Sequence, residues 1–156
     1  MVYSPHSIKM FVFTLISAVF FFSCSQVKNS AKSEDIVLHI GSACGWCAGT
    51  DSLYISYPKL HYEYKAGCGE KGLAKDSTIS KEDWNGLVAT LDMAAFNKIT
   101  LNTCAVCADG CDTWISVRKG NAYHKITFDD IDHEQLNPVR KFVERLIALK
   151  KKTGVR

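Results

Sequence analysis

Apolar and polar residues alternate along five short stretches of the chain, which is the pattern of strands that bury one face. Pro58 and Lys59 separate the second stretch from the third, and Gly120 lies in the short connection between the last two. Connections this short favour hairpins and antiparallel pairing. The five predicted strands cover residues 36–40, 53–57, 60–65, 113–118 and 122–128.

Two segments repeat their apolar residues at helical spacing. The first covers residues 81–96, with Ser80 as its N-cap and Asp83 at the capping-box position. The second opens with Asn137 as its cap and Pro138 as its first helical residue, a position where proline is favoured. The predicted order is βββ-α-ββ-α, so we expect an α+β domain, an antiparallel sheet with two helices on one face. The predicted core stripes are Trp84, Leu87, Val88, Leu91 and Ala95 in the first helix, and Val139, Phe142, Val143, Leu146 and Leu149 in the second.

The N-terminal segment predicts export. Residues 10–22 carry no charge, but a spanning helix needs roughly 20 apolar residues, so this run suits the core of a signal peptide. Ser23 then directly precedes Cys24, an arrangement that resembles the lipobox of bacterial lipoprotein signals. By that resemblance, residues 1–23 are removed and Cys24 becomes the lipid-attached first residue of the mature chain. An ordinary secretory signal cut near Ser23 and a retained N-terminal helix are the alternatives.

The segment after this signal predicts the domain organisation and the location. Residues 24–34 are expected to be a lipidated Cys and a flexible polar tether, residues 35–152 a single domain, and residues 153–156 a tail. The tether lacks the run of Asp or Glu with which some bacterial lipoproteins are exported to the cell surface, so by this resemblance the domain faces the periplasm. Ser25 after the cysteine resembles the signal for sorting to the outer membrane. We therefore expect a cell-envelope protein that is lipid-anchored in the outer membrane and faces the periplasm, in a host with two membranes.

Charge argues against one class of partner. Without residues 1–23 the chain has 18 Lys and Arg against 16 Asp and Glu, a net charge of +2, whereas a nucleic-acid binder should be strongly basic on one face. Residues 137–156 hold seven basic residues against Glu144 alone. The simpler interpretation of this segment is a solvated helix face, and the alternative is contact with anionic lipid headgroups.

Six cysteines follow Cys24, a high density for one domain, and an exported domain can form disulfides. We expect three structural disulfides, although the spacing does not choose among the possible pairings. Three of these cysteines precede the first predicted helix and three follow it, so at least one bridge must join the two groups. The six are Cys44, Cys47, Cys68, Cys104, Cys107 and Cys111.

Two other interpretations of these cysteines stay open. Cys44 and Cys47, which follow a strand as C-G-W-C, would be the working dithiol of a thiol–disulfide oxidoreductase, although no amphipathic helix follows to lower a thiol pKa. The same two residues with Cys104 and Cys107 would be the four thiolates of a zinc-binding module, although the gap between the two pairs is far longer than usual.

No other motif predicts a catalytic residue, a cofactor or a metal site. Acidic turns at 109–112 and 129–132 lack the ligand register of a calcium loop. The strand aromatics are expected to pack beneath the helices, and a face that holds a ligand or partner is the alternative. They are Tyr54, Tyr57, Tyr62, Tyr64, Trp114 and Tyr123. The histidines that follow the predicted signal peptide are His39, His61, His124 and His133, and the first two fall on the more polar face of their strands.

Three stretches, IGSACGWCAGTDSLYI, CAVCADGCDTWISV and NPVRKFVERLIALKK, together resemble a family of small bacterial envelope lipoproteins with a Cys-rich α+β domain of unknown function. The resemblance spans roughly residues 36–150 and implies the location and the fold, but no site residue. The sequence therefore predicts a lipid-anchored envelope protein with a disulfide-stabilised binding or structural domain. Its expected partners are the membrane, through lipid on Cys24, and an unidentified envelope protein or small ligand, with no cofactor and no nucleic acid.

Overall fold

The computed structural model describes residues 35–69 and 71–154. The chain divides into two compact units, Met1–Ala31 and Lys32–Arg156, and the described residues belong to the second. The predicted signal peptide and Cys24 lie outside the described residues.

Six strands form one antiparallel sheet in the order β4-β3-β2-β1-β5-β6. All five predicted strands are present, and the hairpin at Pro58 and the turn at Gly120 are confirmed. The strands are β1 (Ile36–Cys44), β2 (Thr50–Ser56), β3 (Lys59–Lys65), β4 (Leu73–Thr78), β5 (Cys111–Lys119) and β6 (Ala122–Phe128).

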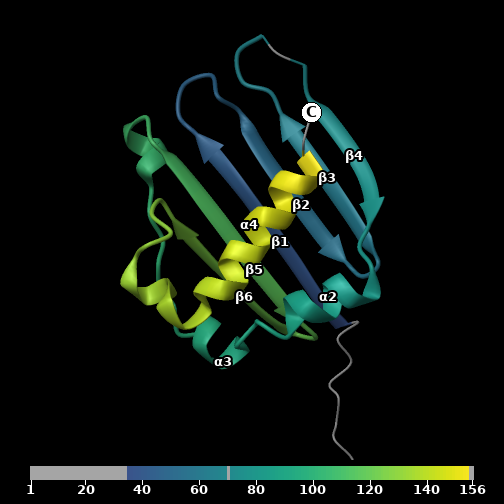
Figure 1. Ribbon diagram of the computed structural model, residues 1–156. Helices are drawn as coiled ribbons and strands as arrows, with labels where there is room; N and C mark the ends of the chain where they lie inside the picture. The colour runs from purple at the N-terminus through teal and green to yellow at the C-terminus, as the bar shows by residue number, and fades with distance from the viewer. Residues whose placement is uncertain (1–34, 70, 155–156) are drawn as a thin grey trace, which may run out of the picture. The chain divides into compact units, whose positions relative to one another are not determined.

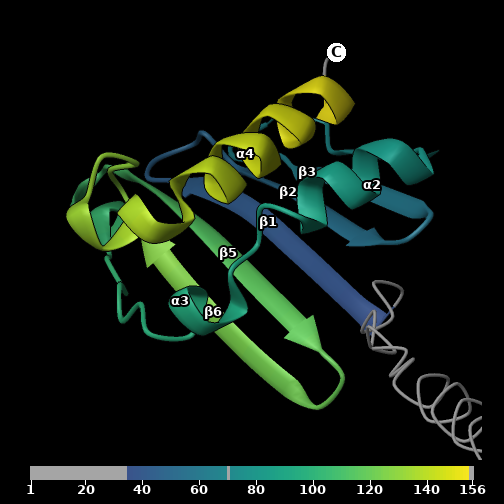
Figure 2. The same cartoon turned by 60° about the horizontal axis from the view of Figure 1, so that its bottom comes forward.

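Helices cover one face of this sheet, as Figures 1 and 2 show. The α+β class is therefore confirmed, but the predicted order βββ-α-ββ-α is wrong, because a fourth strand and further helices are present. The helical segments are α2 (Lys81–Val88), α3 (Met93–Phe96), the 3-10 helices η2 (Ala105–Ala108) and η3 (Glu134–Val139), and α4 (Arg140–Gly154).

The corrections have local causes. Strand β4 is an edge strand whose residues are mostly exposed, so it shows no apolar alternation. The predicted helix over 81–96 is two helices, because Asp92 accepts a hydrogen bond from the Ala95 amide and caps a second, short helix. Ser80 does cap α2, accepting from the Asp83 amide.

The last helix also begins elsewhere than predicted. Asn137 is not its cap and Pro138 is not its first residue, because both lie within η3. His133 caps η3 by accepting from the Gln135 amide, and α4 follows from Arg140 to Gly154, two residues beyond the predicted end of the domain at 152.

The hydrophobic core fills the space between the sheet and the helices. Along β1, Ile36, Leu38 and Ile40 are buried, while the residues between them point to the opposite face. The fully buried large side chains that complete this core are Leu53, Ile55, Trp84, Phe96, Ile115, Val117, Ile126, Leu136, Phe142 and Leu146. The predicted burial of Tyr62 and Tyr64 is confirmed, but Tyr54, Trp114 and Tyr123 fall on the other face of the sheet.

Candidate functional site

The six cysteines form three disulfides at one end of the sheet. Cys44 bonds Cys111 across β1 and β5, as the prediction of a bridge between the two groups requires. The other two bridges are Cys47–Cys68 and Cys104–Cys107. Three connections therefore meet at this end: the β1–β2 turn, the β3–β4 loop and the segment around η2.

These connections touch through their backbones. The Gly45 amide donates to the Gly110 carbonyl over 2.9 Å, and a Cβ atom on Gly67 would lie 1.9 Å from the Cys47 carbonyl oxygen. A side chain at position 67 would therefore push the loops apart. Trp46, at the tip of the β1–β2 turn, is 83% exposed and has a φ of 52°, which is rare for a bulky residue.

The pairing changes what the cysteines can do. Cys44 and Cys47 are not bonded to each other, so a dithiol between them would require two disulfides to rearrange. The four cysteines of the zinc hypothesis are all in disulfides, and no group of three His, Cys, Asp or Glu suited to a metal occurs among the residues that the structure describes. The bonded pair with C-x-x-C spacing is Cys104–Cys107.

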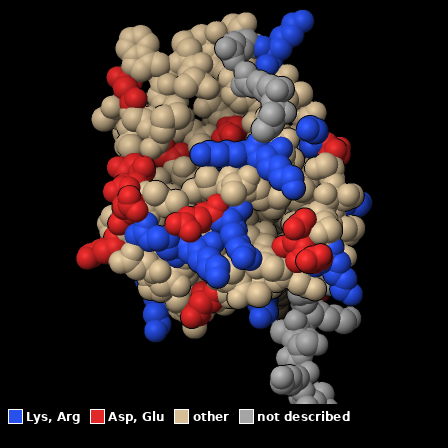
Figure 3. Space-filling model, viewed as in Figure 1, with Lys and Arg blue, Asp and Glu red and all other residues tan. Residues whose placement is uncertain are grey.

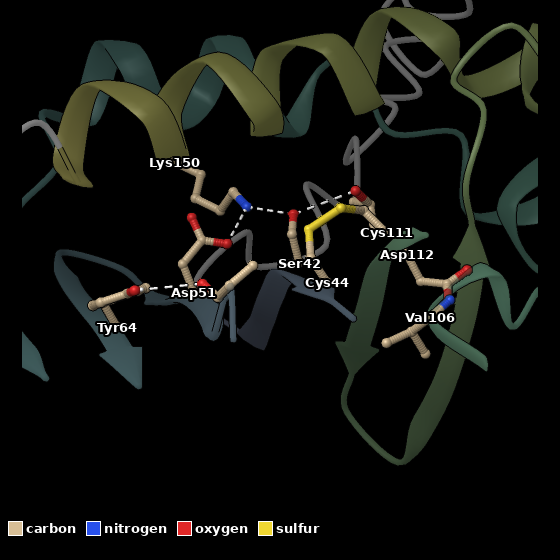
Figure 4. Close-up of a disulfide and its surroundings, with 10 residues drawn as sticks. Ser42, Cys44, Asp51, Tyr64, Val106, Cys111, Asp112 and Lys150 are labelled. Atoms are coloured by element: carbon tan, nitrogen blue, oxygen red, sulfur yellow. Dashed lines mark hydrogen bonds and ion pairs between the residues drawn. A yellow bond between two sulfur atoms is a disulfide. The ribbon is translucent and has the colours of Figure 1, made fainter. Parts of the chain in front are cut away.

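A partly buried ion pair links α4 to the sheet beside the Cys44–Cys111 bridge (Figure 4). The Lys150 side chain is 8% exposed, and its ammonium donates to the Asp51 carboxylate and to the Ser42 hydroxyl, over 2.6 Å in each case. Its neighbours along the helix, Lys151 and Lys152, are exposed. Because a carboxylate satisfies the charge of Lys150, we interpret this contact as structural.

Asp112 has a similar structural role on β5. It is buried, and its carboxylate accepts from the Thr103 hydroxyl over 2.6 Å and from the Val106 amide over 2.8 Å. Burial acts to raise the pKa of Asp112, but the hydrogen bonds from Thr103 and from the amides of Val106 and Ala105 outweigh it and hold the pKa below its ordinary value. The ionised carboxylate therefore fixes the segment that carries η2.

The open face of the sheet is the candidate functional site. One cross-strand row of residues on it crosses all six strands, and Figure 2 shows the labelled helices on the opposite side of the sheet. In strand order from β6 to β4 this row is Lys125, Ser116, His39, Tyr54, His61 and Asp76. His39 and His61 are thus on one face, as predicted, with Tyr54 between them. His61 pairs with Asp76 through a contact of 2.7 Å.

The next row adds a tryptophan over a glycine. Trp114 pairs with Gly41, and a Cβ atom on Gly41 would lie 2.1 Å from Cζ2 of the indole, so the ring occupies the space directly over β1. The His39 ring meets both Trp114 and Tyr54 edge-on, with centroids 6.2 Å apart in each pair. The Lys125 ammonium lies 5.8 Å from the indole centroid, a cation–π distance.

These rings border a hollow of about 350 Å³ on the open face. Strands β2 and β3 complete its lining with short hydroxyl side chains and with charged ones, among them Thr50, Ser52, Glu63 and Lys65. Burial lowers the pKa of His39, and the positive charge of Lys125 lowers it further, so this imidazole is neutral at pH 7.

A second hollow, of about 360 Å³, lies between α2 and α4 on the helical side. Arg145 bridges it by donating to the Gly86 carbonyl, and its rim is charged, as Figure 3 shows for the helical side as a whole. We interpret this groove as a helix-packing contact, because the charges on its rim are typical of a solvated helix surface. The open face combines aromatic rings with hydroxyl, acidic and basic side chains, and it is the better candidate for a functional site.

Three features of this region were not predicted. The Trp114–Gly41 pair depends on the register between β1 and β5, and the Lys150–Asp51 pair on the docking of α4, both of which are long-range. The third is the positive φ of Trp46, in the turn between Cys44 and Cys47. The sequence signal that could have indicated this site is the alternation of apolar and polar residues. It places His39, Tyr54, His61 and Trp114 on the polar side of their strands.

The chain matches no protein-family model and no curated protein. Within residues 35–69 and 71–154, the helices are too short or too polar to cross a membrane.

Proposed function

We propose that this chain is a lipid-anchored protein of the cell envelope, outer-membrane-bound and facing the periplasm, whose domain binds a ligand or partner. The observation that carries the binding role is the open sheet face, with aromatic rings and paired polar groups around one hollow.

The composition of this face supports binding. Trp114 and Tyr54 supply large ring surfaces at a small cost in conformational entropy, and such residues dominate contact surfaces in proteins. Tyr54 is 42% exposed although it makes an edge contact with His39, so it can lose further exposure when a ligand binds. The disulfides and the Lys150–Asp51 pair hold the strands beneath it in fixed positions, which lowers the cost of ordering the site on binding.

Site-specific photo-crosslinking tests the binding role. A photoreactive phenylalanine analogue replaces Tyr54 in the full chain, expressed in a bacterial host, and Glu144 on the exposed side of α4 is replaced in the control. We expect adducts from position 54 and none from position 144. An absence of adducts from position 54, with the protein folded and exported, would contradict the binding role.

Fractionation tests the anchor separately. The lipobox-like Ser23–Cys24 sequence supports it, and two acyl chains suffice for stable attachment. We expect Cys24→Ser to move the protein from the membrane to the soluble fraction, with the folded domain unchanged by its thermal melt. If the variant stays in the membrane fraction, the lipid anchor is wrong.

One observation favours a second candidate, thiol–disulfide exchange. Both residues of the Cys104–Cys107 bridge are exposed, and the surrounding segment is held independently by Asp112. In this role a substrate dithiol would reduce the bridge and leave as a disulfide. The test is whether mild reductant opens this bridge alone, reversibly, and whether the reduced protein then reduces insulin. If all three bridges open together or none opens, this candidate fails.

A further inference from the structure

We propose that the ligand of the open face is a neutral glycan, a chain of uncharged pyranose sugars that lies in the hollow over β1, β2 and β3. This inference rests on the proposed binding role of that face and adds the chemical class of the ligand.

The ionic groups that line the hollow are paired within the protein, and Lys125 beside it lies against the Trp114 indole. The Lys65 ammonium lies 3.6 Å from the Glu63 carboxylate, and His61 contacts Asp76. His39 is neutral for the reasons given above. A phosphate or carboxylate ligand is normally held by several cations that are free to pair with it, whereas these pairs offer an ionic ligand no surplus of either charge. The site is therefore complementary to an uncharged ligand.

The shape of the apolar part suits a sugar ring. A pyranose has a flat face of C–H groups that packs against an aromatic ring, with its hydroxyls around the rim. The indole of Trp114 lies directly over Gly41, so no side chain from β1 lifts it away from the sheet. Tyr54, one strand further, supplies a second ring at the side of the same hollow.

The polar groups suit a rim of hydroxyls. Each sugar hydroxyl both donates and accepts, so it requires acceptors and donors close together. Thr50 and Ser52 offer hydroxyls that do both, while Glu63 accepts and Lys65 donates. A peptide added as a strand would instead need the backbone of a sheet edge, and this hollow lies over the middle strands.

The three tryptophans of the chain allow a direct test by NMR of the full protein in detergent micelles. Their environments differ: Trp114 lines the hollow, Trp84 is 1% exposed in the core, and Trp46 is 83% exposed at the end of the sheet that carries the disulfides. Cellotetraose and chitotetraose are the probes, titrated to a few millimolar. We expect saturable movement of the Trp114 indole signal with a Kd of about 1 mM or tighter, while the signals of Trp84 and Trp46 stay in place.

Matched variants locate the contact. Tyr54→Ser removes a ring from the hollow and should weaken binding about tenfold. Tyr123→Ser removes an exposed tyrosine from the β5–β6 hairpin on the same face, outside the hollow, and should leave the affinity unchanged. A tetramer of galacturonic acid, which carries negative charge, should bind more weakly than either neutral probe.

The outcomes separate this inference from the binding role itself. No movement of the Trp114 signal with any probe, or equal loss in the two tyrosine variants, overturns the glycan. If crosslinks from position 54 still form, and mass spectrometry finds peptides of a second protein in them rather than sugar, the face binds a protein and only the ligand class is wrong. If neither adducts nor shifts occur, both proposals fail.

Discussion

The two faces of the sheet are made by the same strands and differ in nearly every other respect. On β1, Leu38 and Ile40 are fully buried beneath the helices, while His39 and Gly41 between them lie on the open face. On β5, Ile115 and Val117 are buried in the same way, and Trp114 lies opposite. Every second residue therefore serves the core, and the residues between them are free of that requirement.

This difference teaches where function can lie in so small a domain. The covered face is fixed by packing, because a change of one methylene group is felt in a close-packed interior. The open face is packed less extensively, with Ser116 and Asp112 as its buried residues on β5, yet it places a tryptophan, a tyrosine and two histidines close together. Solubility does not need such residues there, and a binding surface does.

The largest contrast between the faces should be in stability. Phe142 on α4 is fully buried and contacts Phe96, so Phe142→Ala should lower the free energy of unfolding by about 3–5 kcal/mol. Tyr54→Ala on the open face should cost less than about 1 kcal/mol. Chemical denaturation with parallel circular dichroism measures both. Equal costs would show that the open face is also a packed surface.

Two of the disulfides should differ in how much they stabilise the fold, because Cys44–Cys111 closes a long loop on the covered face and Cys104–Cys107 closes a short one. The sequence separation is 67 for the first pair, against 3 for the second. In the chain-entropy treatment, replacing both cysteines of the first pair by Ser should cost about 4 kcal/mol, and of the second about 2 kcal/mol. Unfolding of the two double variants under non-reducing conditions tests this, and the reverse order would contradict it.

Most of the strand pattern could be predicted from the sequence, because alternation follows directly from burial on one face. β4 could not, since an exposed edge strand has no such pattern. The split of the predicted helix at Asp92 depends on a local cap that competes with the apolar period.

The candidate site was less accessible to sequence reasoning. That His39, Tyr54 and His61 share a face follows from alternation. Their alignment in one row depends on the strand order and register, which tertiary structure determines. The pairing of Cys44 with Cys111, rather than with Cys47, has the same origin.

Substitutions at Lys150 test whether this charged residue stabilises the covered face through its pair with Asp51. Lys150→Met leaves the Asp51 carboxylate without its partner, and since the Asp51 side chain is 29% exposed to water, the loss should be about 1–3 kcal/mol. Lys151→Met, one residue on and exposed, should have no effect beyond about 0.5 kcal/mol. The double variant Lys150→Met, Asp51→Leu should recover part of the loss. If it is less stable than Lys150→Met, the pair does not act as interpreted.

The smallest effect should come from His39. The folded-state pKa of His39 lies below the ordinary value of 6.5, so the unfolded chain binds the proton first as pH falls. The contribution of His39 to the free energy of unfolding should therefore be constant above pH 6.5. It should decrease as the pH falls below 6.5 towards the lowered pKa. His39→Gln should remove this contribution, and Lys125→Met should reduce it. An unchanged slope in His39→Gln would assign the pH dependence to other groups.

The central claim is that the open face is occupied in the envelope, and hydroxyl-radical footprinting of the unmodified protein tests it most directly. Oxidation rates of Tyr54 and Trp114 are measured in isolated envelopes and in the purified protein in detergent, with Tyr123 and Trp46 as internal references. We expect the first two residues to be protected in envelopes relative to the references. Equal rates in both preparations for all four residues would contradict the claim that this face binds a ligand or partner.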